Sequence, residues 1–233
     1  MREPLREIVL DTETTGLDPS QGDRMVEIGC IELINHMPSG ETFQRYLNPE
    51  RDMPPGAFAV HGLSEAFLAD KPLFADVADD FLGFVGGDPL IIHNAAFDLG
   101  FIDAELVRLE REPLAREAVV DTLLIARRKF PGAPASLDAL CRRFAIDTSG
   151  RDLHGALLDA GLLADVYLAL IGGRQPGLGL AADTGETEAK PAAAPSETET
   201  NARAPRSHAP EPSEIEAHTA FIDGLKDPIW RRR

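Results

Sequence analysis

Short β-forming runs alternate with helical repeats along residues 1–172, and this alternation restricts the chain to a layered α/β fold. We expect three strands in the first part of the chain, at 7–10, 25–35 and 42–47. The Pro-Ser-Gly sequence at 38–40 predicts the turn between the second and third of these strands. Because short loops join them, the three strands should be antiparallel.

Helical and strand patterns then follow each other directly. Pro89–His93 is a continuous apolar run that predicts a strand, and helical periodicity resumes from Phe97, which implies a strand-to-helix crossover. A further strand is expected at 118–121. Helices are expected at 74–85, 97–109, 122–129, 136–144 and 155–170. The sequence therefore predicts an α/β fold with a mixed sheet flanked by helices.

The composition is that of a protein without membrane segments. Charged residues make up 27% of the chain, and no apolar run approaches the ~18 residues that a membrane-spanning helix needs. The first residues enter a strand-like run without the apolar core of a signal peptide, so we expect a cytoplasmic protein. Cys30 and Cys141 lie far apart in apolar segments and are expected to be buried thiols.

Two acids mark the end of the first expected strand. Asp11 and Glu13 are two residues apart, so their side chains point to the same face of the sheet and can hold one hard cation between them. Taken alone, the pair proves little, because two solvated acids at a strand end would give the same pattern.

Two later segments supply further polar groups. Asp98 lies where the strand 89–93 gives way to a helix, the usual ligand-facing end of such a crossover, although an N-cap aspartate would lie there too. His154 and Asp159 are five residues apart, about 500° along an ideal helix, so their side chains would not share a helix face. We therefore expect His154 on the loop or first turn and Asp159 one turn into the helix. A histidine at a helix start can also be a cap or a surface residue.

Carboxylates that converge without cysteine favour Mg²⁺ or Mn²⁺ over structural zinc. Two such cations, about 3.5–4 Å apart, would stabilise both the attacking and the leaving oxygen of an in-line displacement at phosphorus. His154, with an unperturbed pKa near ~6.5, would suit the role of base for the attacking water.

Three segments, DTETTG, HNAAFD and HGALLD, resemble the motifs of the DEDDh, or DnaQ-like, exonuclease family. The resemblance covers roughly residues 6–170 and implies a ribonuclease-H-like fold, two catalytic metals and release of 5′-mononucleotides from a 3′ end. By this resemblance Asp11 bridges both metals, Glu13 and Asp159 bind the first, Asp98 supports the second through water, and His154 is the base.

The resemblance also indicates substrate contacts around the site. They are expected from Thr14, Thr15, His61, Asn94 and Phe97. A purely structural role in its loop is the alternative for His61. The substrate implied is a single-stranded or frayed DNA 3′ end.

The net charge of −16 is unusual for a protein that binds nucleic acid, which normally presents a basic face. Two explanations are available. A cluster of carboxylates can bind cations, and a partner protein can supply the main affinity for DNA.

The chain divides at 172 into an exonuclease domain, a linker at 173–213 and a terminal segment at 214–233. The linker is rich in Ala, Pro, Gly, Glu, Thr and Ser, which predicts a flexible tether. Within it Gln175, Leu178 and Leu180 resemble a sliding-clamp-binding peptide, with an ordinary linker as the alternative.

The terminal segment repeats apolar residues at helical spacing and predicts a short amphipathic helix. Phe221, Leu225 and Trp230 are expected to dock on another protein. The family resemblance implies that this protein is the catalytic subunit of a replicative DNA polymerase. The alternative is a helix that packs back on its own domain.

Three functions remain open on the sequence. The first is a DNA proofreading exonuclease, and the second is a related exonuclease for RNA ends or small oligonucleotides that would need no docking tail. The third is a non-catalytic scaffold, which would lack at least one of the five catalytic residues. All five are present, and the tail favours the first.

Overall fold

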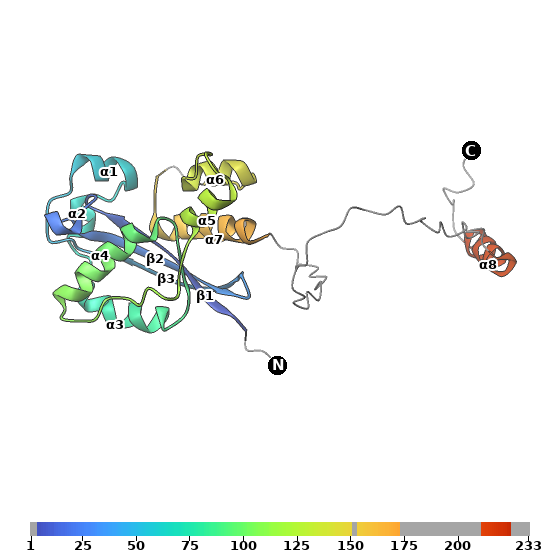
Figure 1. The fold of residues 1–233 in the computed structure, drawn as a ribbon, viewed down its shortest axis with the longest axis horizontal. Coiled ribbons are helices and arrows are strands. Elements are labelled where there is room, and N and C mark those ends of the chain that lie inside the picture. The colour runs from blue at the N-terminus through green and yellow to red at the C-terminus, as the bar shows by residue number, and fades with distance from the viewer. Residues whose placement is uncertain (1–3, 151–152, 173–210, 225–233) are drawn as a thin grey trace, which may run out of the picture. The chain divides into compact units, whose positions relative to one another are not determined.

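The computed structural model describes residues 4–150, 153–172 and 211–224. The chain divides into two units, Met1–Leu180 and Ala181–Arg233, which are described separately. The first unit contains the sheet and most of the helices (Figure 1).

A five-stranded sheet in the order β3-β2-β1-β4-β5 forms the centre of the first unit. The strands are β1 Arg6–Thr14, β2 Met25–Ile34, β3 Met37–Tyr46, β4 Leu90–Ile92 and β5 Val119–Asp121. β1, β2 and β3 pair antiparallel, whereas β4 runs parallel to β1 and β5 parallel to β4. The predicted mixed sheet is confirmed, with β1 at its centre.

The turn between β2 and β3 lies earlier than the sequence predicts. Asn35 and His36 form it, both with positive φ, and the expected turn at 38–40 lies inside β3. Asn and His occupy the left-handed region more readily than most residues. Proline is tolerated within β3 because β3 is an edge strand, where one row of backbone N–H groups has no partner strand.

The helices of the first unit are α1 Pro55–His61, α2 Glu65–Leu68, α3 Phe74–Val85, α4 Ala95–Arg108, α5 Thr122–Lys129, α6 Leu137–Phe144 and α7 Ala156–Ile171, with a 3₁₀ turn at Pro19–Gln21. The five helices expected from periodicity are confirmed within about two residues. α1 and α2 were not predicted, because the proline-rich segment before them reads as a loop. Pro55 instead occupies the first turn of α1, where proline fits a helix.

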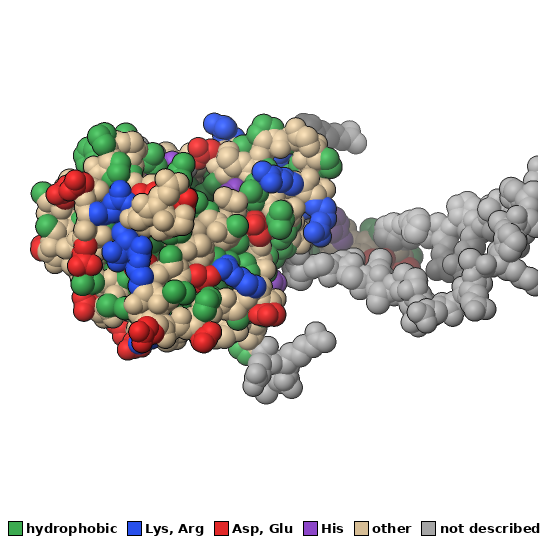
Figure 2. All heavy atoms as spheres, turned by 60° about the vertical axis from the view of Figure 1, so that its left-hand side comes forward, with side chains coloured by type: hydrophobic (Ala, Val, Ile, Leu, Met, Phe, Trp, Pro, Cys, Tyr) green, Lys and Arg blue, Asp and Glu red, His purple; other side chains and the backbone are tan. Residues whose placement is uncertain are grey.

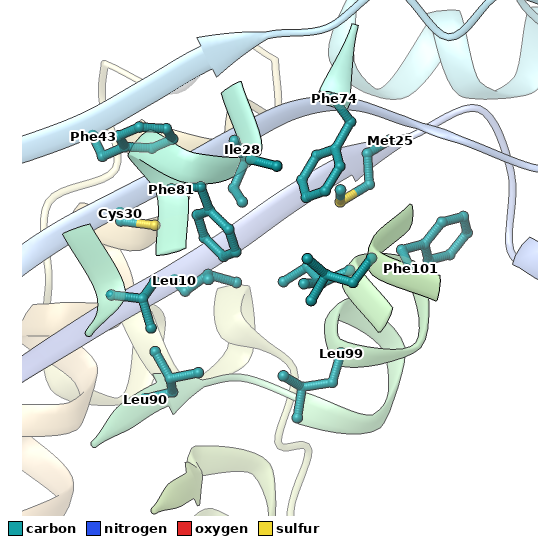
Figure 3. Close-up of a cluster of buried hydrophobic side chains, with 14 of the residues drawn as sticks. Leu10, Met25, Ile28, Cys30, Phe43, Phe74, Phe81, Leu90, Leu99 and Phe101 are labelled. Atoms are coloured by element: carbon teal, nitrogen blue, oxygen red, sulfur yellow. The ribbon is translucent and has the colours of Figure 1, made fainter. Parts of the chain in front are cut away.

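Two apolar layers bury the sheet. On one face Ile8 and Leu10 pack against α3 and α4, and Figure 3 shows Leu10, Phe81 and Leu99 in this cluster. On the other face Val9 packs against α7. α5 and α6 add a third cluster over α7, on the side of the sheet opposite α3 and α4 (Figure 1). Because side chains alternate along a strand, Asp11 and Glu13 share the α7 face with Val9.

Two further expectations can be compared with the structure. Cys30 and Cys141 are both buried, as predicted. In the described part of the chain, no helix has the length and apolar character required to traverse a lipid bilayer.

The second unit contains the helix α8, Pro212–Asp223, which confirms a short helix in the first part of the terminal segment 214–233. Residues 225–233 lie outside the described residues. None of its described residues is buried, and Ile215 and Phe221 are 52% and 64% exposed. The remaining residues predicted to contact partners lie outside the described residues: Gln175, Leu178, Leu180, Leu225 and Trp230.

Candidate active site

β1 and the start of α7 bring three polar side chains together. Ligand atoms of Glu13, His154 and Asp159 all lie within 4.8 Å of one another. Glu13 is near the end of β1, Asp159 is in the first turn of α7, and His154 precedes the helix. Both carboxylates are buried, with 8% and 3% of the residue exposed. The positions expected for His154 and Asp159 relative to the helix are therefore those found.

His154 is oriented by two contacts. Its Nδ1 lies 2.9 Å from Asp159 Oδ2, and its backbone N–H donates to the Val60 carbonyl. Because Nδ1 faces a carboxylate, Nδ1 carries the proton in the neutral ring and Nε2 is the basic nitrogen. The side chain is 44% exposed, so solvent reaches the ring.

A close contact fixes the start of α7 on the sheet. A Cβ at Gly29 of β2 would lie 2.3 Å from Leu157 N and 2.4 Å from Ala156 C, so only glycine permits this approach. Asp11 is the register partner of Gly29 in β1. The first turn of α7, which carries Asp159, therefore lies directly over the strand pair that carries Asp11 and Glu13.

Glu27 ties the same helix end to β2. It is buried, and its Oε2 accepts from the N–H of Ala156, while its Oε1 accepts 2.7 Å from Gln44 Nε2. The helix has no side-chain cap at Gly155, so Glu27 satisfies one of its first N–H groups. Sequence reasoning missed this residue. The signal was an acid inside the apolar run MVEIGC.

Asp11 and Asp98 lie outside the group of three. Asp11 is half-buried on the same face of β1 as Glu13. Asp98 is buried in the first turn of α4, and its Oδ1 accepts 2.7 Å from Thr12 Oγ1. Burial raises the pKa of Asp98 to about 7, although the hydrogen bond from Thr12 acts in the opposite direction. The N-cap of α4 is Asn94, so Asp98 is not the helix cap.

A second acid, Asp121, holds the crossover from β4 to α4 in place. Asn94 adopts a left-handed conformation with φ 66°, and the N–H groups of Asn94 and Ala95 each donate 3.2 Å to Asp121. Asp121 also caps α5 by accepting from the N–H of Leu123. This carboxylate therefore fixes the starts of two helices, a role that its place at a strand end did not reveal.

Other candidate substrate residues are engaged within the protein. Thr14 Oγ1 donates 2.6 Å to the Gly16 carbonyl, and Thr15 Oγ1 accepts 3.0 Å from the N–H of Arg24. The Phe97 ring packs against Phe101, with ring centroids 5.1 Å apart. Both threonine hydroxyls thus stabilise the loop that follows β1.

His61 lies at the end of α1, and only 4% of the residue is exposed. Its Nδ1 accepts 3.0 Å from the N–H of Leu63, so the proton of the neutral ring is on Nε2. Burial lowers the pKa of His61, which keeps the ring neutral. Nε2 makes no hydrogen bond of normal geometry to a described residue, although the backbone of Thr14 lies close enough to oppose the lowering of the His61 pKa.

A cavity of about 520 Å³ lies between α1 and α6 and reaches His154. Its described lining consists of Ala59, Val60, Asp138, Arg142, Thr148, Leu153 and His154. The cavity is large enough for part of a nucleotide chain.

Comparison with known proteins identifies the class. The model of a family described as Exonuclease matches residues 8–167, and the chain belongs to this family. The chain is 59% identical over 174 residues to DNA polymerase III subunit epsilon of Rickettsia prowazekii, covering 73% of this chain and 76% of the relative. It is 51% identical over 176 residues to DNA polymerase III subunit epsilon of Escherichia coli, covering 72% of each.

Solved structures agree with this assignment. Exonuclease X in complex with 5′ overhanging duplex DNA is 27% identical, with a TM-score of 0.57 over 71% of this chain and 90% of that one. The nuclease domain of 3′hExo, a DEDDh family member bound to rAMP, is 17% identical, with a TM-score of 0.63 over 72% of this chain and 92% of that one. The predicted ribonuclease-H-like fold is confirmed.

Proposed function

We propose that this chain is a 3′→5′ DNA exonuclease that removes mispaired 3′-terminal nucleotides as 5′-mononucleotides and proofreads for DNA polymerase III. The observation that carries the proposal is the convergence of Glu13, Asp159 and His154 where the end of the central strand β1 meets the start of α7. The relatives named DNA polymerase III subunit epsilon, 51–59% identical, support the proofreading role.

The DEDDh family depends on divalent metals, and we propose two ions, Mg²⁺ or Mn²⁺, for this chain. The residues fit such ions, because buried carboxylates held within 4.8 Å of each other would repel without positive charge between them. Glu13 and Asp159 would hold the first ion, and Asp11 would contact both ions. Asp98 would support the second ion through water. The ions would supply positive charge to the attacking and leaving oxygens.

His154 acts as the general base in this proposal. Nε2 takes a proton from the attacking water, and the imidazolium that forms is stabilised by the Asp159 carboxylate at Nδ1. The 2.9 Å contact at Nδ1 holds the ring in the required tautomer throughout.

The 3′-terminal nucleotide would be held next to this group. The buried Nε2–H of His61 is a donor suited to a sugar or phosphate oxygen, since an unsatisfied buried donor is costly. Asn94 and Phe97 would contact the base and sugar. The hydroxyls of Thr14 and Thr15 and the N–H of Thr15 are engaged within the protein, so these two residues would act by holding the loop that the nucleotide contacts.

Metal removal tests the proposal. The full chain treated with EDTA should release no nucleotide from a duplex with a mispaired DNA 3′ end, and adding Mg²⁺ or Mn²⁺ should restore the activity, because the acids need cations to hold the phosphate. The measurement is nucleotide release from labelled DNA. A matched RNA 3′ end serves as the second substrate. Preferential digestion of RNA would instead favour an RNA exonuclease, and undiminished activity in EDTA would exclude the metal mechanism.

We also propose a polymerase partner, a sliding-clamp partner and a cytoplasmic location. Residues 173–213 would act as a flexible linker, and Gln175, Leu178 and Leu180 within it would bind the clamp. Residues 214–233 would dock on the alpha subunit of DNA polymerase III through Phe221, Leu225 and Trp230. α8 supports docking, because its apolar side chains Ile215 and Phe221 are exposed. Tethering keeps the nuclease at high effective concentration near the primer end.

Truncation tests these partners. A chain ending after Gly173 should bind neither the alpha subunit nor the clamp in a pull-down, because both proposed contact segments are removed. The same truncated chain should retain nuclease activity on free DNA, since the described site lies within residues 11–159. The matched control is the full chain with Phe221→Ala, which should lose the polymerase and keep the clamp. Capture of both partners by the truncated chain would refute the assignment of the tail.

A further inference from the structure

The positive charges of the described residues fall into two groups. Most lysine and arginine side chains form ion pairs with Asp or Glu, namely Arg6, Arg24, Arg45, Arg51, Lys71, Arg108, Arg111 and Arg116. The others have no carboxylate partner among the residues that the structure describes, and all lie on α5 and α6: Arg127, Arg128, Lys129, Arg142 and Arg143. We call this set the α5–α6 basic cluster.

Five basic residues without a carboxylate partner in the described structure are unexpected in a chain with a net charge of −16, where acids are plentiful. Figure 2 shows basic and acidic side chains interspersed on the face it presents, so the acidity does not exclude basic patches. Asp138 lies on α6 in the same cavity lining as Arg142, but five cations on two short helices still repel one another, and a polyanion would offset that repulsion. A cluster of this kind is the electrostatic footprint of a phosphate-binding surface.

The cluster borders the active site at two points. Arg142 lines the cavity that reaches His154. Arg127 lies near His93 at the end of β4, directly before the Asn94 crossover. Burial is the main reason that the pKa of His93 is lowered, and the charge of Arg127 contributes to the same shift.

The cluster also continues away from the site. Arg142 lines a second hollow of about 500 Å³, together with Pro134, Ala139 and Arg143. Arg143 packs over the Phe130 ring at 4.4 Å, which joins α6 to the end of α5. The two hollows therefore meet at Arg142, the first reaching His154 and the second lying along α6.

We propose that Arg127, Arg142 and Arg143 bind phosphates of the single DNA strand immediately 5′ of the scissile bond. This inference rests on the proposed exonuclease function. A single strand suits the surface because its phosphates can follow the two hollows, and guanidinium groups bind phosphate oxygens in a bidentate manner. The cluster holds the strand after each terminal nucleotide is removed.

The experiment uses the full chain with Arg127→Gln and Arg143→Gln combined, because neither side chain lines the cavity that reaches His154. The matched control combines Arg45→Gln and Arg111→Gln, which removes the same charge from residues paired with Asp80 and Asp79. Binding of labelled single-stranded oligothymidylate is measured against salt concentration, with Ca²⁺ replacing Mg²⁺ to slow hydrolysis. Hydrolysis of the p-nitrophenyl ester of thymidine 5′-monophosphate with Mg²⁺ reports on the active site without an upstream strand.

Each lost phosphate contact should reduce the slope of log Kd against log salt by about 0.7, so the double variant should lose about 1.4. Between about 50 and 200 mM salt, the unsubstituted chain should therefore lose roughly sevenfold more affinity than the variant. The control should keep the original slope. Hydrolysis of the small ester should be equal in all three proteins.

Other results overturn the inference. An unchanged slope of log Kd against log salt in the double variant would overturn the inference. An equal decrease of this slope in the control would show a general effect of net charge and would overturn it too. Should the unsubstituted chain hydrolyse neither substrate, the proposed function fails, while the salt slopes still decide whether the cluster binds phosphate.

Discussion

The Asp11→Ala variant is expected to release nucleotides from a mispaired DNA 3′ end at least about 10³-fold more slowly than the unsubstituted chain. Loss of the ligand proposed to contact both metals removes several kcal/mol of transition-state stabilisation, and each ~1.4 kcal/mol is tenfold in rate. His154→Ala should lower the rate by about 10²–10⁴-fold, because it removes only the proposed base. The measurement is Mg²⁺-dependent nucleotide release at saturating DNA.

Both variants should fold normally. Asp11 lies in a region dense in carboxylates, so its removal relieves repulsion in the metal-free protein. Circular dichroism should match that of the unsubstituted chain, and thermal unfolding should occur at the same or a higher temperature. Asp70→Ala is the control, because Asp70 is exposed and pairs only with its neighbour Lys71 in the described structure, and it should be fully active. Undiminished nucleotide release by both site variants would refute the assignment of the active site.

Gly29→Ala is expected to lower both stability and activity. The added methyl would lie 2.3 Å from Leu157 N and 2.6 Å from Leu157 Cα, and backbone atoms cannot move independently of their helix. α7 must therefore shift by about an ångström, which costs about 1–3 kcal/mol in overpacking. That shift displaces Asp159 from Glu13, and a misplacement of this size can cost about 10²-fold in rate.

Gly161→Ala is the matched control on the same helix. Its Cβ would meet Ile31 Cδ1 at 3.6 Å, an ordinary contact, and alanine favours a helix interior by about 0.5–1 kcal/mol over glycine. This variant should be at least as stable as the unsubstituted chain and equally active. Urea unfolding and nucleotide release measure the two effects. Normal stability and activity in Gly29→Ala would show that α7 is not held by close contact with β2.

Periodicity and spacing predicted much of this architecture. The continuous apolar run that became β4 and the three- and four-residue repeats of α3 depend on local burial, which a sequence displays directly. The geometry of an ideal helix was sufficient to place His154 before α7 and Asp159 within it.

Features that depend on contacts between residues far apart in the sequence were not predictable. The turn at Asn35 depends on β3 being an edge strand, which is a property of the whole sheet. The hydrogen bond between Thr12 and Asp98 joins residues that are far apart in sequence, and nothing local to either residue indicates it. The role of Glu27 likewise requires the start of α7 to lie over β2.

The order of elements along the chain has a consequence for biosynthesis. β1 carries Asp11 and Glu13, whereas α7, the last helix of the first unit, carries Asp159. A ribosome therefore completes the strand well before it makes the helix that closes the site. A nascent or prematurely terminated polypeptide that lacks α7 also lacks Asp159, one of the proposed metal ligands, so we expect no degradation of nucleic acid before this unit is fully made.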